Sequence, residues 1–112
     1  MTNVTYKGID DMIASLEIPY AYYQFPKGTA QPTPFVCFYF SDQSGLLADN
    51  INYVRIVRLV IELYTDDKRF DLENAIHNLL TENEIPYQQY ESYIDTEQML
   101  LNTYEMEVYL NG

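Results

Sequence analysis

The sequence predicts one α+β domain over residues 1–112, with two helices packed on one face of a mainly antiparallel sheet of about five strands. A chain of 112 residues fits one compact domain and leaves no room for two independent cores. Apolar residues recur at helical spacing in two segments, whereas other segments show the apolar runs or alternation of strands. These segments follow one another in the order α-β-β-β-α-β-β.

Two segments have the apolar spacing of amphipathic helices. The first, from about Tyr6 to Leu16, carries four residues on one helical face: Ile9, Met12, Ile13 and Leu16. The second, roughly Arg69 to Asn83, carries five: Leu72, Ala75, Ile76, Leu79 and Leu80. Asp66 and Asp67 precede the second helix, where we expect them to cap its N-terminus. A proline shortly after each helix, Pro19 or Pro86, prevents its continuation.

The first half of the chain contains two expected strands and two expected loops. Tyr20–Phe25 reads as a short aromatic strand, and Phe35–Phe40 as a central strand covered on both faces. Pro26–Pro34 is rich in proline, which predicts a loop. Ser41–Asn52 contains many turn formers and is expected to be a second long loop.

The second half contains three expected strands. Tyr53–Thr65 is the longest, with alternating apolar residues on one face. Tyr87–Ile94 and Met99–Leu110 are expected to form a hairpin across the turn at residues 95–98. The last of these strands alternates most regularly, with Thr103, Glu105 and Glu107 on the face opposite its apolar residues.

One tetrapeptide occurs twice, each time between a helix and a tyrosine-rich strand. Glu17-Ile18-Pro19-Tyr20 follows the first helix, and Glu84-Ile85-Pro86-Tyr87 follows the second. Proline ends a helix and presets an extended backbone, and the isoleucine can pack beneath the helix end. The repetition is either a degenerate duplication or the same junction chemistry used twice.

Composition limits the class of protein. Seventeen acidic and six basic residues give a formal charge of −11, and such a surface repels phosphate backbones, which disfavours sequence-specific nucleic-acid binding. Twelve tyrosines favour half-buried strand positions and protein interfaces. Neither an N-terminal signal stretch nor a membrane-spanning run is visible, so we expect synthesis in the cytoplasm and no membrane contact.

Residues that could carry chemistry are few and isolated. His77 is the single histidine, and Cys37 is the single cysteine, expected to be a buried thiol. No second histidine or suitably spaced carboxylate completes a transition-metal site, and no glycine-rich phosphate loop or serine nucleophile motif occurs. We therefore expect no catalytic residues, no metal, no cofactor and no enzymatic activity.

The layout of the chain resembles a family of viral assembly proteins. Four segments carry the resemblance: the strand Arg55–Thr65, the segment Asp66-Asp67-Lys68-Arg69, the helix Leu72–Leu80 and the Glu84–Tyr87 entry into the terminal hairpin. The chain is similar to the tail-terminator, or tail-completion, proteins of long-tailed bacteriophages and prophages. These are also called head–tail joining or minor capsid proteins. The resemblance implies a ring, commonly a hexamer, that caps the finished tail tube and docks onto the head connector protein. The protein would then pass from the host cytoplasm into the tail or neck of the virion.

Two groups of residues are candidates for this role. The expected loop Ser41–Asn50, with Gly45, Leu46 and Leu47, is the first choice for contacting a partner, because apolar residues in a polar loop mark a contact surface or a loop folded onto its own core. The segment Gly28–Pro34 is the second choice, and its candidates are Gln31 and Thr33.

Glu105 and Glu107 are candidates for an acidic lining of the ring, past which DNA would slide. An alternative function is an acidic DNA mimic that inhibits a nucleic-acid-binding protein, which requires carboxylates arranged in a continuous strip. A further alternative is a small enzyme, which requires a cleft where polar groups converge around His77, Glu73 and Tyr90.

Overall fold

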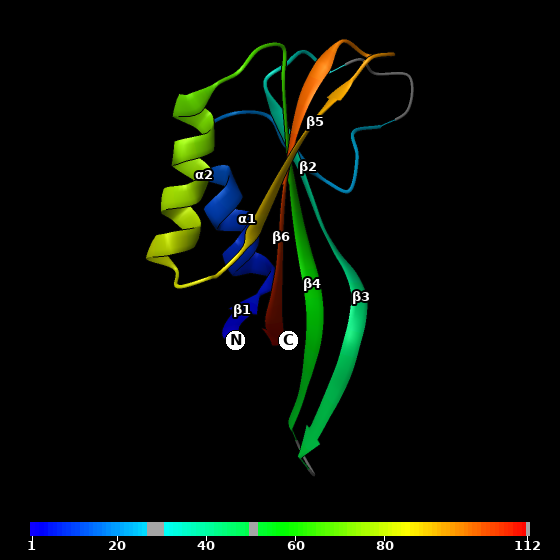
Figure 1. The fold of residues 1–112 in the computed structure, drawn as a ribbon. Coiled ribbons are helices and arrows are strands. Elements are labelled where there is room, and N and C mark those ends of the chain that lie inside the picture. Colours follow the sequence, from blue (N-terminus) through cyan, green and yellow to red (C-terminus); the bar gives the residue numbers. More distant parts are fainter. Residues whose placement is uncertain (27–30, 50–51, 112) are drawn as a thin grey trace.

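The protein is a twisted mixed sheet with two helices against it. The structure is a computed structural model that describes residues 1–26, 31–49 and 52–111. Of residues 42–49 and 52–54 it describes the backbone only. Both helices lie on the same side of the sheet, and two strands extend beyond the rest of the molecule as a long hairpin (Figure 1).

The described residues form six strands and two helices. In chain order they are β1 (Thr2–Thr5), α1 (Tyr6–Ala14), β2 (Tyr20–Tyr22), β3 (Phe35–Asp49), β4 (Asn52–Thr65), α2 (Phe70–Glu82), β5 (Gln88–Ile94) and β6 (Met99–Asn111). The strands lie in the order β1-β6-β4-β3-β2, and β5 also pairs with β6. β1 and β5 therefore share one edge of β6, at its C-terminal and N-terminal ends respectively.

The predicted fold class, a mainly antiparallel sheet of about five strands in the order α-β-β-β-α-β-β, is wrong. The described chain has six strands in a mixed sheet, because β1 precedes the first helix and pairs in parallel with β6. β2 also pairs in parallel with β3, whereas β3–β4, β4–β6 and β5–β6 are antiparallel. The prediction failed because these parallel pairings join segments that are distant in the sequence.

The segment Ser41–Asn52, predicted to be a loop, is also corrected. Residues 41–49 continue β3 and pair with β4, down to Asp49 opposite Asn52. The turn formers are accommodated by register shifts between Ser41 and Gln43 and between Gln43 and Gly45, which are typical of β-bulges. Residues 50 and 51 lie outside the described residues, as do residues 27–30 of the expected loop Pro26–Pro34.

The repeated tetrapeptide occupies the same position in two β-α-β crossovers. β1-α1-β2 and β4-α2-β5 each join two strands that run in the same direction through a helix on one face of the sheet. At the end of each helix the glutamate takes a left-handed backbone conformation, with φ of 60° at Glu17 and 57° at Glu84. Ile85 then donates its backbone N–H to the carbonyl of Leu80 (2.9 Å) and is buried, which closes the end of α2.

The two helices begin differently. Thr5 caps α1, because its Oγ1 accepts a hydrogen bond from the backbone N–H of Gly8 (2.9 Å). α2 starts after Arg69 without a side-chain cap. The expected capping by Asp66 is not seen, because its carboxylate instead accepts a hydrogen bond from the Thr33 hydroxyl.

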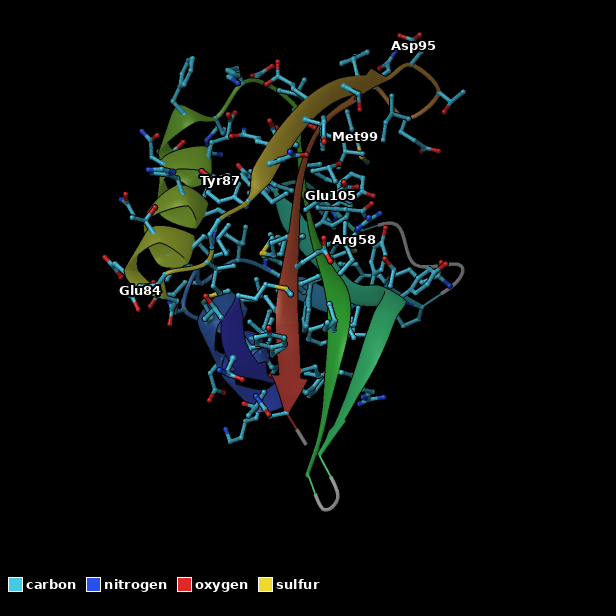
Figure 2. All side chains as sticks on the ribbon, turned by 60° about the horizontal axis from the view of Figure 1, so that its bottom comes forward. Arg58, Glu84, Tyr87, Asp95, Met99 and Glu105 are labelled. Atoms are coloured by element: carbon cyan, nitrogen blue, oxygen red, sulfur yellow. The ribbon has the colours of Figure 1, made fainter. Side chains whose placement is uncertain are left out.

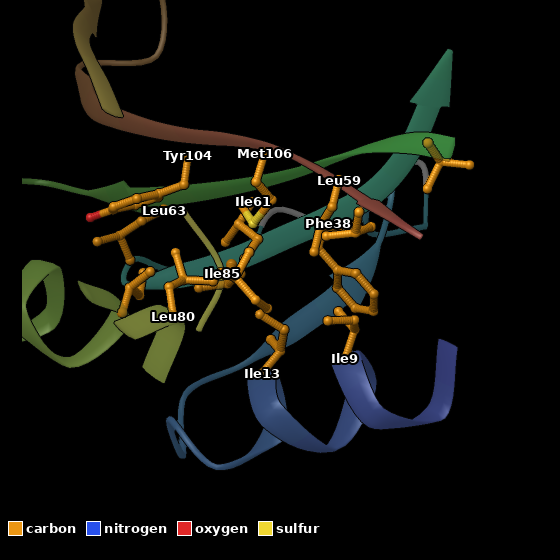
Figure 3. Packing of buried hydrophobic residues seen from close by; sticks show 14 of the residues in the cluster. Ile9, Ile13, Phe38, Leu59, Ile61, Leu63, Leu80, Ile85, Tyr104 and Met106 are labelled. Atoms are coloured by element: carbon orange, nitrogen blue, oxygen red, sulfur yellow. The ribbon is translucent and has the colours of Figure 1, made fainter. Parts of the chain in front are cut away.

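The core lies between the helices and one face of the sheet (Figure 3). α1 contributes Ile9 and Ile13, and α2 contributes Ile76 and Leu80. They pack against alternate residues of the three central strands: Val36, Phe38, Val57, Leu59, Ile61, Leu63, Tyr104, Met106 and Val108. Burying each such side chain contributes roughly 1.5–3 kcal/mol to stability. The sheet face toward the helices therefore forms the core and is not available to a partner.

Candidate assembly surface

The first candidate surface is the projecting hairpin. We define the arm as residues 41–49 of β3 together with residues 52–58 of β4. Leu46 pairs with Arg55 and Leu47 with Val54 at its far end, and Gly45 pairs with Ile56. β6 pairs with β4 only from Arg55 onward, so the end of the arm is a two-stranded ribbon that extends past the other strands (Figure 1). The three residues predicted to contact a partner therefore lie on a strand.

The outer edge of the arm is open. β2 pairs with β3 only along Val36–Phe38, and the backbone N–H of Phe40 donates to the Tyr22 hydroxyl (3.1 Å). Beyond this point, residues 41–49 pair with β4 on one side and with no strand of the described chain on the other. Unpaired backbone donors and acceptors along a strand can accept another strand.

β5 forms a second open edge. It pairs with β6 on one side, and no described strand covers its other side. Its seven residues, Gln-Gln-Tyr-Glu-Ser-Tyr-Ile, are exposed except for Ile94, with Tyr90 51% and Tyr93 55% accessible. The strand contains no lysine or proline, the residues that commonly protect sheet edges from pairing.

A polar network holds β5 against α2. We call it the Glu73 network; its members are Lys68, Glu73, Gln89, Glu91 and Asn102. Glu73 accepts hydrogen bonds from Lys68 Nζ (2.9 Å), Gln89 Nε2 (3.2 Å) and Asn102 Nδ2 (3.4 Å). Gln89 also donates to Asn102 Oδ1 (3.0 Å), and Lys68 forms an ion pair with Glu91. Asn102 is fully buried and Glu73 nearly so, so these partners offset the cost of removing both groups from water.

The Glu73 network was not predicted from the sequence, although two signals pointed to it. Asn102 occupies an inward position of β6, between Leu100 and Tyr104 in the alternation. Glu73 lies on the same helical stripe as Ile76 and Leu80. A polar residue at a core position requires a buried partner.

The opposite face of the sheet carries no helix, and aromatic side chains line one end of it. We call it the helix-free face. The ring of Phe35 stacks on Tyr64 with centroids 4.7 Å apart, and Phe25 packs edge-on against Phe35. Tyr23 lies against Tyr39 at 5.3 Å. Tyr23 and Phe25, which follow β2, therefore cover part of this face.

Glu62 lies among these aromatic residues. Burial raises the pKa of its carboxyl group, and a hydrogen bond from the Tyr64 hydroxyl (3.1 Å) acts in the opposite direction. Burial also raises the pKa of the neighbouring Cys37 thiol to about 11, with a smaller contribution from Glu62. Cys37 is thus a buried, protonated thiol at neutral pH, as the sequence predicted for its burial.

Glu105 and Glu107 also lie on the helix-free face, at its centre. Glu107 is exposed and Glu105 half-buried, and Arg58 of β4 pairs with Glu107 in the register. Arg58 and Glu105 lie close together on this face (Figure 2) and line an open hollow of about 510 Å³ with Gln88, Tyr87 and Met1. The two predicted acids are therefore brought together, but next to a cation.

The second candidate segment, with Gln31 and Thr33, lies apart from the arm. Both residues are half-buried, and the Thr33 hydroxyl donates to Asp66 Oδ1 (2.6 Å). This bond ties the start of β3 to the turn before α2, which gives Thr33 a structural role at that site.

The residues considered for an enzyme site do not converge. His77 contacts the Tyr87 hydroxyl, Glu73 belongs to the buried network, and the Tyr90 hydroxyl bonds to its neighbour Gln88. Among the described residues, no group of histidine, cysteine and carboxylate side chains is arranged to hold a metal ion. Within the same part of the chain, no helix has the length and apolarity needed to cross a membrane.

Comparison with known proteins shows a likeness at the level of the fold. No protein-family model matches the sequence, and no curated protein matches it. A chain of a solved structure, "Virion of native gene transfer agent (GTA) particle", is similar over 89% of this chain and 84% of its own length, with a TM-score of 0.57 and 13% sequence identity. The two chains share a fold.

Proposed function

We propose that this protein is a structural component of a phage or phage-like virion that assembles from copies of itself and binds neighbouring virion proteins. In the finer form of the proposal, one domain of residues 1–112 forms a ring that caps the tail tube and joins it to the head connector protein. The protein is then present in the host cytoplasm during assembly and afterwards in the tail or neck of the virion.

The observation that carries the proposal is the likeness in fold, over most of both chains, to a chain of a gene transfer agent particle. The surfaces of the molecule are compatible with it. One sheet face is used for the core, whereas the arm and β5 present open edges, and exposed tyrosines line β5. Large amphipathic side chains at an exposed edge suit association between proteins.

An assembly assay tests this function. The purified chain is mixed with the tail-tube protein of the same virus or prophage, and the mass of the complexes is followed by light scattering. We expect rings of this chain that bind to assembled tubes. Leu46→Asp combined with Leu47→Asp leaves the monomer folded but prevents ring or tube association, because it places two charges on the arm.

The matched control adds the same two charges elsewhere. Ala14 and Asn78 are exposed positions at the end of α1 and on α2, so Ala14→Asp with Asn78→Asp changes the net charge equally. Normal assembly by the arm variant would show that the arm is not part of the interface. Loss of assembly in both variants would attribute the effect to net charge.

Glu105 and Glu107 are proposed to face the lumen of the ring. Reversing both to lysine should slow the passage of DNA, because phosphates would bind to a cationic lining. Glu17→Lys with Glu82→Lys, at exposed positions remote from this face, is the control of equal charge. DNA ejection at the normal rate from particles with the Glu105 and Glu107 variant would exclude a lumenal position.

The alternative of a DNA mimic receives less support. A mimic needs an uninterrupted strip of carboxylates, but Asp11, Asp71, Glu73 and Glu91 are ion-paired with lysine or arginine. Arg58 adds a cation beside Glu105 and Glu107.

A further inference from the structure

We propose that copies of this chain associate head to tail by strand pairing, in which the open edge of β5 in one copy adds to the open edge of the arm in the next. This inference rests on the proposed function, since it specifies how the ring is closed. Its occupant is a second copy of this chain, bound through backbone hydrogen bonds.

The two edges are complementary in position. β5 lies on one side of the sheet and β3 on the other, so pairing them uses two different surfaces of the same molecule. Such heterologous contacts generate closed rings when the rotation between neighbours closes, and filaments when it does not. The remaining edge strands, β1 with four residues and β2 with three, are too short to provide a comparable contact.

The two edges are also complementary in direction and length. β3, β4, β6 and β5 alternate in direction across the sheet. In its own sheet Glu91 is level with Val36, so a second copy in the same orientation must be displaced along the strands to bring its residues 41–49 beside β5. It then presents its β3 antiparallel to β5. The open part of β3, residues 41–49, has nine positions for the seven residues of β5, which allows the backbone of β5 to be paired along its whole length.

The charges favour this pairing over association of two identical edges. Pairing β5 with β5 would bring together two copies of Glu91 and of the acidic turn that carries Asp95 and Glu97. The arm carries Arg55 and Arg58 as well as Asp42 and Asp49, so it has no excess of negative charge.

The register places the acidic turn near Arg58 of the next copy, although Asp42 of the arm lies beside the turn as well. If Glu91 faces Gly45 of the next copy, Ile94 faces Asp42, and the acidic turn beyond it lies at the level of Ser41. Ser41 pairs with Arg58 in its own sheet. The turn and the arm lie at opposite ends of the molecule (Figures 1 and 2). Each copy can therefore offer its turn to one neighbour and its arm to the other.

β5 is held in position before any partner arrives. Its inward side chains, Gln89 and Glu91, are fixed by the Glu73 network, and its outer edge pairs with no strand in the part of the chain that the structure describes. A fixed strand loses little conformational freedom on pairing, which favours association.

Disulfide cross-linking tests the pairing. In a Cys37→Ala background, Ser92→Cys on β5 is combined in turn with Gln43→Cys, Ser44→Cys or Leu46→Cys on the arm. Because neighbouring residues of a strand alternate between faces, this scan covers both faces near the expected register. We expect at least one double variant to give, on oxidation, a ladder of covalent oligomers that ends at the size of the ring.

The single-cysteine variants are the controls. Ser92→Cys alone is expected to remain monomeric in denaturing gels, and a covalent dimer from it would show β5–β5 pairing and overturn the proposal. Rings that form normally while none of the double variants cross-links would also overturn it, but would leave the proposed function intact. A chain that remains monomeric with tail-tube protein present would overturn both.

Discussion

Removing the Asn102 side chain is expected to weaken the attachment of β5. Asn102 accepts a hydrogen bond from Gln89 and donates one to the carboxylate of Glu73. A neutral hydrogen bond contributes about 1 kcal/mol and one to a charged group about 1.5–3 kcal/mol. The second bond is long at 3.4 Å, so we use the lower part of that range. Asn102→Ala should therefore lower the free energy of unfolding by about 2.5–3 kcal/mol.

Urea denaturation measures this loss. A domain of this size commonly has about 5–15 kcal/mol of stability, so the variant is expected to stay folded. Asn111→Ala is the matched control, because Asn111 is the same residue type on the same strand and its bond to Asn3 is exposed. The control should lose roughly 0.5 kcal/mol or less.

A double-mutant cycle with Glu73→Gln separates the network from simple loss of packing. Residues in one hydrogen-bond network couple by about 0.5–3 kcal/mol, whereas independent sites add. The reasoning is refuted if Asn102→Ala costs no more than Asn111→Ala, or if the cycle shows no coupling between Asn102 and Glu73.

Three further predictions concern single side chains. Glu84→Gly should stabilise the protein by about 0.5–1 kcal/mol in urea denaturation, because glycine adopts the left-handed conformation found there without steric cost; a lower stability would contradict this. Glu62→Gln should be more stable than the parent protein at neutral pH, because the folded state favours the protonated carboxyl of Glu62. This advantage in the free energy of unfolding should shrink as the pH falls through the raised pKa of Glu62 toward the ordinary value of 4.5. An advantage independent of pH would exclude burial of the charge as its cause. Tyr104 is a core residue whose hydroxyl meets no partner in the described residues. Tyr104→Phe should therefore change the free energy of unfolding by less than about 1 kcal/mol, whereas Tyr104→Ala should lower it by about 3–5 kcal/mol. Equal effects of the two variants in thermal or urea unfolding would show that the hydroxyl, not the ring, supports the core.

The elements with a regular apolar pattern could be located from the sequence. The second helix was expected over Arg69–Asn83 and spans Phe70–Glu82, and the terminal hairpin has its turn at residues 95–98 as expected. In these segments a single face meets the core, so the local periodicity reports the tertiary structure directly.

The arm could not be located in this way. Ser41, Asp42, Ser44 and Gly45 are turn formers, and their local preference predicts a loop. They become a strand because β4 continues opposite them and bulges absorb the irregular residues. The predicted contact residues Leu46 and Leu47 thus lie on a strand that the local sequence does not predict.

β1 and the two parallel strand pairings could not be predicted from the local sequence either. Thr2–Thr5 is too short to show a strand pattern, and its partner, residues 108–111 of β6, lies at the other end of the chain. The repeated tetrapeptide was the one local sign of the two crossovers, because it marks the return from each helix to the sheet.

Electron microscopy of tail tubes assembled with this chain tests the proposed function most directly. If the protein closes into a ring that caps the tube, density for the ring should appear at one end of each tube and nowhere along its wall. Binding along the wall, or tubes without any added density at saturating protein, would contradict the assignment.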